Sequence, residues 1–333
     1  MMMKKDYSTY LEYLKGRRYD EVLKEPVLSE SFYEYDYPDP LKYAFEAMHE
    51  IDPSYSYKLF STVKRTQDLL TQRLSKRDYQ VDARYQGPHN CDTHTTLYGD
   101  LELVILLKEH GNNPAKKVEG LVSEIMDILS SAHAYNKIDY SSRNRIHIQT
   151  RKPTCDLSIL PAVWVDSSLY KNTGLEINRA ICEFDFANKK RRIHLPFLNM
   201  ARINSKDREL KGNLKALIRL LRNLVKDSEE PIELSFEEIS GLLYNIPNKY
   251  LDVPKSKLLS VLPVISFQMK RLILKDAYRM KILAPSGKEY VFGKHPKKKA
   301  ILLLKKELDL LIKNLMISLK EFDLTIKDDV EYL

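Results

Sequence analysis

The chain has 333 residues, of which 43% are hydrophobic and 30% are charged, and its formal net charge is +8. This balance is typical of a folded protein with a sizeable core and excludes a disordered chain. No apolar run approaches the ~20 residues of a membrane span, and the three cysteines form no CxxC pair, which argues against a disulfide framework or a zinc site and favours a reducing compartment such as the cytoplasm.

Helical spacing dominates the first part of the chain. The sequence predicts helices over 5–25, 40–50 and 54–76, and a segment rich in Pro, Tyr and Asp over 26–40 predicts irregular structure. The early helices could pack on either half of the molecule. We expect residues 1–53 to form N-terminal helices that pack on the core, without assigning them to one half.

A region of mixed helix and strand follows. Helical periodicity predicts a helix over 115–134, and alternating or wholly apolar runs predict strands. The expected strands cover 79–86, 101–107, 146–150, 155–160, 180–186 and 191–195. Pro161 is expected to end the fourth of them because proline cannot donate to a strand ladder. These elements predict a mixed sheet with flanking helices, which we place in a domain over 54–205.

From about residue 206 the pattern becomes mostly helical. The stretch 210–226 is strongly amphipathic, and 297–322 predicts a long helix rich in lysine and leucine. Proline and glycine predict a small hairpin near 283–293. We therefore expect a helical domain over 206–333 and assign the whole chain to the α+β class.

Two acidic side chains stand two residues apart at the start of an apolar run. Strand alternation would point Asp100 and Glu102 to the same side. Two like charges this close cost free energy unless something neutralises them. A divalent cation is the usual answer, and Mg²⁺ prefers one or two carboxylates together with substrate phosphates. The pair therefore predicts a site for phosphoryl or nucleotidyl transfer.

Asp156 supplies the third carboxylate that such a site needs. It stands at the start of a second apolar run, as Asp100 does. If the two strands are neighbours, all three carboxylates meet at one sheet edge and can serve as catalytic residues and ligands of Mg²⁺ or Mn²⁺. Asp156 would also act as, or beside, the general base. A lone acidic pair at a strand start is more commonly just solvated, and Asp156 together with Gly87 favours the site over that alternative.

The order of these residues resembles a known family. Gly87, then Asp100-x-Glu102 thirteen positions later, then Asp156, is similar to the polymerase β-type nucleotidyltransferase superfamily, in which a glycine-containing turn precedes a strand with paired acids. The segments 194–197, 203–206, 214–222 and 235–244 resemble the helical half of the cyclic GMP-AMP synthase and oligoadenylate synthase-like enzymes, a branch that includes bacterial signalling nucleotidyltransferases. The resemblance covers roughly residues 54–250.

The resemblance implies an enzyme that transfers an NMP unit from an NTP with release of pyrophosphate. Its expected product is a cyclic or linear oligonucleotide signal of the bacterial antiphage type. Among nucleotide-binding residues, Gly87 would let the backbone approach the triphosphate, and Arg222 would replace a phosphate-binding lysine. Ser235 would hydrogen-bond phosphate, and Phe236 would stack on the base.

Two departures from the family pattern leave alternatives open. Pro88 stands where the family has serine after the glycine of the nucleotide-binding turn, and it offers neither a hydroxyl nor a backbone N–H. The second acid is Glu102 rather than aspartate. The chain could therefore be a nucleotide-binding module without turnover. A nucleotidyltransferase of the toxin type, which acts on RNA or protein, is the other alternative. The basic charge suits NTPs and also RNA, and we expect no membrane partner.

Overall fold

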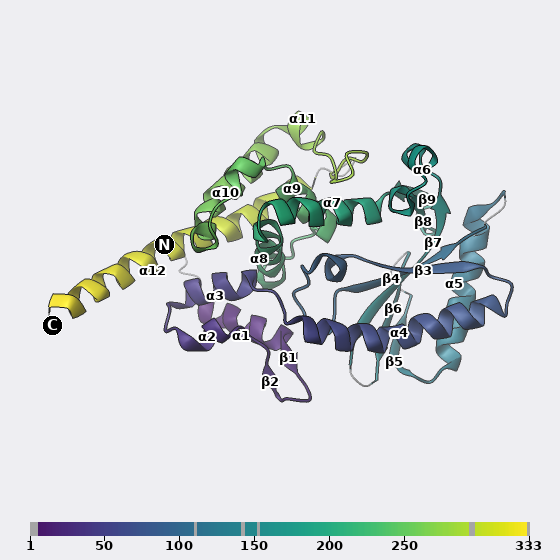
Figure 1. The fold of residues 1–333 in the computed structure, drawn as a ribbon, viewed down its shortest axis with the longest axis horizontal. Helices are drawn as coiled ribbons and strands as arrows, with labels where there is room; N and C mark the ends of the chain where they lie inside the picture. The colour runs from purple at the N-terminus through teal and green to yellow at the C-terminus, as the bar shows by residue number, and fades with distance from the viewer. Residues whose placement is uncertain (1–5, 110–111, 141–143, 152–153, 293–296, 332–333) are drawn as a thin grey trace. The chain divides into compact units, whose positions relative to one another are not determined.

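The computed structural model describes residues 6–109, 112–140, 144–151, 154–292 and 297–331 (Figure 1). Contacts divide the chain into two compact units. One unit, Asp52–Arg202, contains the main sheet. The other is helical and combines Met1–Ile51 with Ile203–Leu333, so the early helices, whose placement the sequence leaves open, belong with the C-terminal helices.

The sheet of the first unit has seven strands in the order β3-β4-β7-β6-β5, and β8 pairs with both β7 and β9. The strands are β3 (Val81–Gln86), β4 (Leu101–Leu107), β5 (Tyr135–Asp139), β6 (Ile146–Thr150), β7 (Asp156–Val165), β8 (Ala180–Asp185) and β9 (Lys190–His194). Among these strands, β4 and β7 pair in parallel and the other pairs are antiparallel. The mixed sheet confirms the predicted α+β class.

Two helices, α4 (Pro53–Ser75) and α5 (Pro114–Ser131), pack beside the sheet (Figure 1). Alternate residues of β4, such as Leu103 and Ile105, share one buried cluster with both helices. The residues between them, such as Val104 and Leu106, join a second cluster with Trp164. Because strand side chains alternate, Glu102 lies on the Val104 face, which is the face opposite α4 and α5.

The helical unit begins with α1 (Tyr7–Arg17), a two-stranded hairpin of β1 (Tyr19–Asp20) and β2 (Glu25–Pro26), α2 (Glu30–Glu34) and α3 (Asp39–Met48). Its later helices are α8 (Asn213–Asp227), α9 (Phe236–Tyr244), α10 (Leu262–Leu274), α11 (Asp276–Arg279) and α12 (Lys298–Glu331). Helix α8 is buried around most of its circumference and contacts α3, α9 and α12. It forms the centre of this unit.

Buried polar contacts join the early helices to α8. Asp227 accepts hydrogen bonds from the Arg17 guanidinium and, at 2.7 Å, from the Tyr43 hydroxyl. The Arg17 guanidinium also donates to the Asn223 side chain at 2.8 Å. Asp227 is 2% exposed, so these donors satisfy a carboxylate that water scarcely reaches.

Several element boundaries differ from the sequence predictions. The first helix ends at Arg17 and a hairpin replaces its predicted second half. Helix α7 (Pro196–Glu209) begins ten residues earlier than the predicted helical region. The prediction that Pro161 ends a strand is wrong, because β7 continues to Val165. Pro161 lies between the last residue of β7 paired with β6, Ile159, and the first paired with β8, Val163, so its missing N–H faces a gap in the ladder.

Smaller elements complete the description. The sequence did not predict β5 or the short helix α6 (Ser168–Thr173). In the region of the predicted hairpin, an isolated bridge pairs Leu283 with Tyr290, and residue 293 lies outside the described residues. None of the helices among the described residues is long and apolar enough to cross a membrane.

Candidate functional site

The parallel pairing of β4 and β7 brings the three predicted acids, Asp100, Glu102 and Asp156, to one edge of the sheet, which we call the acidic edge. Leu101 pairs with Leu157, so Asp100 and Asp156, the residues before them, occupy matching positions where the two strands begin. Glu102 stands one pair further along. Glu102 and Asp156 share the face opposite α4 and α5, because each lies an even number of residues from the apolar side chains of that face.

Asp100 reaches this edge by a different backbone conformation from the one expected. It precedes β4 and has φ +64°, in the left-handed region. Strand alternation therefore does not relate it to Glu102, and the sequence argument that the two side chains are neighbours in a regular strand is wrong. The Asp100 carboxylate accepts hydrogen bonds from the Thr95 backbone N–H at 3.2 Å and from the Thr95 hydroxyl at 3.3 Å, contacts that hold it against the preceding loop.

Two glutamines that the sequence analysis missed flank the other two acids. Gln86 is the cross-strand partner of Glu102, and its amide donates to Glu102 Oε2 at 2.9 Å. Gln149 is the cross-strand partner of Asp156, and its amide donates to Asp156 Oδ1 at 3.1 Å. A neutral amide orients a carboxylate without cancelling its charge. A glutamine directly opposite an acid can be recognised only when the strand register is known. The sequence alone therefore could not identify these two residues.

Gly87 lies directly against the second acid. Its φ is +87°, which glycine adopts readily, and a Cβ there would stand 3.6 Å from Cγ and Cδ of Glu102. Pro88 begins a 3₁₀ turn that runs to Cys91, and its carbonyl accepts from the Thr93 N–H at 2.9 Å. Pro88 is buried and helps to shape the turn that passes Glu102.

The loop that follows this turn is buried rather than solvated. His89 and His94 are 3% and 2% exposed, and their rings stack with centroids 3.8 Å apart. His89 Nε2 lies 2.8 Å from the Gly99 carbonyl oxygen, which ties the start of the loop to the residue before Asp100. The His89 imidazole, stacked on that of His94, therefore fixes the residue before Asp100 to the 3₁₀ turn.

Arg145 is a cation beside this edge that the sequence analysis also missed. Its guanidinium lies 3.7 Å from Glu102 Oε2 and 4.0 Å from Glu183 Oε2. Glu183 is buried, and its Oε1 lies 2.5 Å from His194 Nε2 across β8 and β9. Burial alone would raise the pKa of Glu183, but the hydrogen bond and charge of His194, with Arg145 and Arg192, lower it to about 2. Glu183 is therefore a fixed negative charge behind Arg145.

The remaining predicted residues belong to the helical unit. Arg222 is 8% exposed, and its guanidinium lies 5.9 Å from the centre of the Phe236 ring. Ser235 is the N-cap of α9 in a capping box, in which its hydroxyl accepts from the Glu238 N–H at 3.2 Å and its own N–H donates to the Glu238 carboxylate at 2.8 Å. Arg222, Ser235 and Phe236 thus form one local group.

Two further basic residues near this group have structural partners. Arg219 donates to the Met48 carbonyl oxygen at 2.7 Å. Lys206, on α7, donates to the carbonyl oxygens of Tyr244 and Ile246, each at 2.6 Å. Burial lowers the pKa of Lys206. These two cations therefore hold backbone segments of the helical unit together.

The acids fit a divalent metal in their donor chemistry. Carboxylate oxygens are the ligands that Mg²⁺ and Mn²⁺ prefer, and the amide donors of Gln86 and Gln149 can remain beside a ligated carboxylate. Within the described ranges, no group of three or more His, Cys, Asp or Glu is gathered closely enough to hold a metal ion. The three carboxylates therefore share an edge without surrounding a common point. The strand register places the three acids at one edge, and their carboxylates accept hydrogen bonds from Gln86, Thr95 and Gln149.

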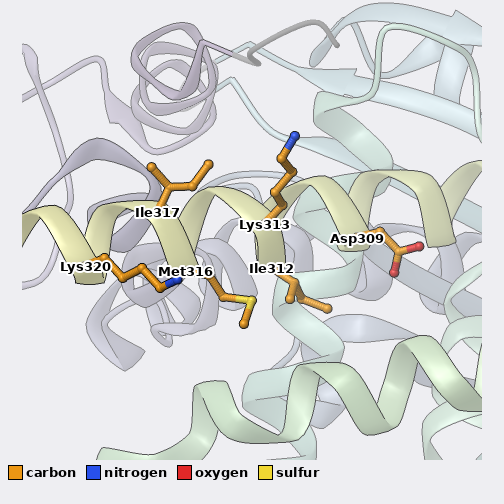
Figure 2. A pocket seen from close by; sticks show the side chains of 6 residues that line it. All are labelled: Asp309, Ile312, Lys313, Met316, Ile317 and Lys320. Atoms are coloured by element: carbon orange, nitrogen blue, oxygen red, sulfur yellow. The ribbon is translucent and has the colours of Figure 1, made fainter.

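A surface hollow of about 410 Å³ lies elsewhere, along α12 (Figure 2). It is lined by Asp309, Ile312, Lys313, Met316, Ile317 and Lys320. All six residues come from successive turns of one helix, and none is among the predicted site residues. This hollow is therefore a feature of the α12 surface and not part of the acidic edge.

Known proteins resemble the chain over nearly its whole length, although no family model matches it. It is 28% identical to a c-di-GMP synthase of Capnocytophaga granulosa, over 94% of this chain and 99% of that protein. It is 24% identical to the cyclic dinucleotide synthase CdnE of Yersinia aleksiciae, over 85% of this chain and 80% of that protein.

A solved structure agrees with these sequence similarities. The STING-associated CdnE c-di-GMP synthase from Capnocytophaga granulosa matches with a TM-score of 0.74 at 27% identity, covering 94% of this chain and 99% of that one. The similarities confirm the predicted resemblance to nucleotidyltransferases of bacterial signalling, with the corresponding fold.

Proposed function

We propose that this protein is a metal-dependent nucleotidyltransferase that joins NTPs into a cyclic dinucleotide signal with release of pyrophosphate. The observation that carries the proposal is the parallel register of β4 and β7, which brings Asp100, Glu102 and Asp156 to one sheet edge beside a glycine turn. The similarity to cyclic dinucleotide synthases along most of the chain supports the class of product.

The protein's own groups have distinct tasks in this reaction. Asp100, Glu102 and Asp156 would hold a divalent cation, which supplies neutralisation of phosphate charge and activation of the attacking hydroxyl. Gln86 and Gln149 orient two of the carboxylates through hydrogen bonds to single oxygens. Catalysis then depends mainly on positioning and on charge neutralisation, because phosphoryl groups need little covalent help from protein side chains.

Gly87 and Arg145 shape the side of the site next to Glu102. The positive φ of Gly87 favours glycine, and the absence of a side chain beside Glu102 would leave space for a triphosphate to approach the backbone. Pro88 contributes no donor there, so phosphate contacts at the turn must come from neighbouring groups. Arg145 is the nearby cation, and its planar guanidinium suits phosphate oxygens.

The helical unit would contribute recognition of the nucleotide. We assign phosphate binding to Arg222 and Ser235 and base stacking to Phe236. The cation–π contact between Arg222 and Phe236 supports this assignment because it keeps a charge and an aromatic face together. The Ser235 hydroxyl accepts the capping bond, and its proton is available to donate to a phosphate oxygen.

The names of the relatives support a substrate class, since three of them are c-di-GMP synthases. We propose GTP as a substrate and c-di-GMP as the first product to seek, since the Capnocytophaga granulosa c-di-GMP synthase matches 94% of this chain. The Yersinia aleksiciae relative is named only for cyclic dinucleotides. A cyclic dinucleotide with two different bases would also fit that broader name.

Incubation of the full chain with the four NTPs, each labelled in turn, and with Mg²⁺ or Mn²⁺ tests the function. We expect a cyclic dinucleotide and pyrophosphate, identified by mass spectrometry, and a loss of at least ~10³-fold in rate for Asp100→Asn or Asp156→Asn. The matched control is Asp166→Asn, an acid of the same unit that pairs with Arg179 at 2.7 Å. It should keep full activity.

Three results contradict the proposal. One is the absence of product from the native chain with either metal and every NTP combination. The second is product from Asp100→Asn at the native rate. The third is label that migrates with added RNA or protein instead of with a small molecule, which would assign the chain to the toxin-type alternative. Binding of ATP or GTP without turnover would assign it to the inactive alternative.

A further inference from the structure

A surface in the helical unit has a charge opposite to that of the whole chain. Residues 19–39 contain seven acidic residues and one lysine, a net charge of −6, whereas the chain carries +8 and its other residues therefore carry +14. Six of the seven acids are exposed. None of these residues belongs to the acidic edge, so the proposed catalytic function does not account for their charge.

Aromatic rings stand among these acids in two groups of touching rings. Tyr35 and Tyr37 stack with ring centres 5.3 Å apart, and Tyr37 meets Phe45 of α3 edge-on at 5.8 Å. Phe32 and Tyr33 of α2 meet edge-on at 5.4 Å. We call these five rings, with the carboxylates of Glu30, Glu34 and Asp36, the acidic aromatic surface.

Three of the five rings are exposed to solvent. Tyr33 is 66% exposed, Tyr35 is 49% exposed and Phe45 is 41% exposed. Removing large aromatic side chains from water is favourable, and exposed groups of them commonly mark interaction sites. Phosphate-rich partners are excluded, because Glu30, Glu34 and Asp36 would repel a nucleic acid or an anionic lipid headgroup.

The chain's own lysines show which chemistry this surface accepts. The ammonium groups of Lys15 and Lys42 lie 5.8 Å and 6.0 Å from the centre of the Phe32 ring. Lys42 also forms an ion pair with Asp36 at 3.2 Å. A cation held by a ring face and a carboxylate together is thus already present inside the surface.

We propose that the acidic aromatic surface binds a segment of a partner protein rich in lysine or arginine. The Tyr33 and Tyr35 rings would receive the cations and aliphatic stems, and Glu30 and Glu34 would pair with further cations at the rim. Charge complementarity would speed the encounter, and ring contacts would hold the complex. The proposal is independent of the proposed catalytic function.

A labelled synthetic peptide of alternating lysine and leucine is the probe, with fluorescence anisotropy on the full chain as the measurement. We expect saturable binding that weakens with salt, and a loss of about tenfold in affinity for Tyr33→Ala combined with Tyr35→Ala, since two cation–π contacts together are worth ~1.4 kcal/mol. Glu30→Lys combined with Glu34→Lys should abolish binding.

The matched control is Phe267→Ala, which removes an aromatic side chain of α10 that is 62% exposed. It should bind the peptide as the native chain does, and all variants should keep the native melting temperature within ~2 °C because the changed side chains are exposed. A peptide in which glutamate replaces lysine should not bind.

Other outcomes overturn the proposal. They include equal binding by the native chain and both double variants, equal binding of the glutamate peptide, and equal loss in Phe267→Ala. The residues outside 19–39 carry a net charge of +14, so a second copy of the chain is the main competing partner for this surface. Sedimentation that shows a dimer lost in Tyr33→Ala with Tyr35→Ala, with no peptide binding, would assign the surface to self-association instead.

Discussion

At the residue scale, the acidic edge depends on partners that set the direction of each carboxylate. Asp100 takes its position from a left-handed backbone and from Thr95, whereas Glu102 and Asp156 lie in regular strand and take theirs from Gln86 and Gln149. In metal sites, groups that orient the ligands without binding the metal commonly change metal affinity by about 10–100-fold, and Gln86 and Gln149 would act in this way if the acids hold the proposed cation.

We therefore expect Gln86→Ala and Gln149→Ala each to weaken metal binding by about 10–100-fold. The fold should persist, because both changes are on strand residues whose backbone pairing is unchanged. Titration with Mn²⁺, followed by electron paramagnetic resonance, measures the metal affinity independently of turnover. Gln72→Ala, an exposed glutamine on α4, is the control. Unchanged Mn²⁺ affinity in both variants would contradict the role.

At the element scale, the start of α9 combines a structural role with a proposed binding role. Ser235 caps the helix, and that contact alone is worth about 1 kcal/mol. Loss of activity in Ser235→Ala would therefore not separate the two roles. Ser235→Asp separates them, because aspartate caps a helix as well as serine but places a negative charge where a phosphate would bind.

For Ser235→Asp we expect native thermal stability and NTP affinity reduced by at least ~10-fold, measured by denaturation and by calorimetry with a non-hydrolysable GTP analogue. Glu238→Ala, which breaks the other half of the capping box, should lower stability and leave affinity nearly unchanged. Native affinity in Ser235→Asp would show that Ser235 only caps the helix.

The β8–β9 pair gives a prediction about pH. The pKa of Glu183 is lowered to about 2 in the folded protein from an ordinary value of 4.5. Its ionised form therefore stabilises the fold above about pH 4.5, and this contribution is lost as the pH falls from 4.5 toward 2. Glu183→Gln should be less stable than the native chain at pH 7, and the difference in the free energy of unfolding should shrink across that window.

Urea denaturation at a series of pH values measures this difference. The control is Glu176→Gln, since Glu176 is exposed and pairs with Arg84 at the surface. It should change stability little at any pH. A gap between native and Glu183→Gln that stays constant from pH 7 to pH 3 would contradict the lowered pKa.

At the scale of the whole molecule, sequence patterns predicted what depends on local periodicity and missed what depends on pairing. The apolar run 101–107 and the helical spacing of 54–76 gave elements within a residue of those observed. Pro161 was misjudged because its cost depends on where neighbouring strands end. Gln86, Gln149 and Arg145 carry no motif, and only the register places them beside the acids.

The placement of the N-terminal helices was likewise beyond local patterns. Their attachment to α8 depends on contacts between residues about 200 positions apart, such as Arg17 with Asp227. No periodicity within 1–51 specifies those partners. The helical unit is therefore discontinuous in sequence, and its two segments are held together by a buried polar centre as well as by apolar packing.

This arrangement predicts a large effect from one side chain in α8. Asp227→Ala leaves the buried Tyr43 hydroxyl and the Arg17 guanidinium without their carboxylate partner, which should cost about 3 kcal/mol of the free energy of unfolding. Hydrogen exchange should show the loss in α1, α3 and α8 and leave the strands of the sheet unit protected, because none of the affected contacts belongs to that unit. Asp252→Ala, an exposed acid of the same unit that pairs with Lys211 at 3.5 Å, should cost less than ~1 kcal/mol. If Asp227→Ala were as stable as Asp252→Ala, the attachment of the N-terminal helices would depend on apolar packing alone, and the discontinuous unit would need no polar centre.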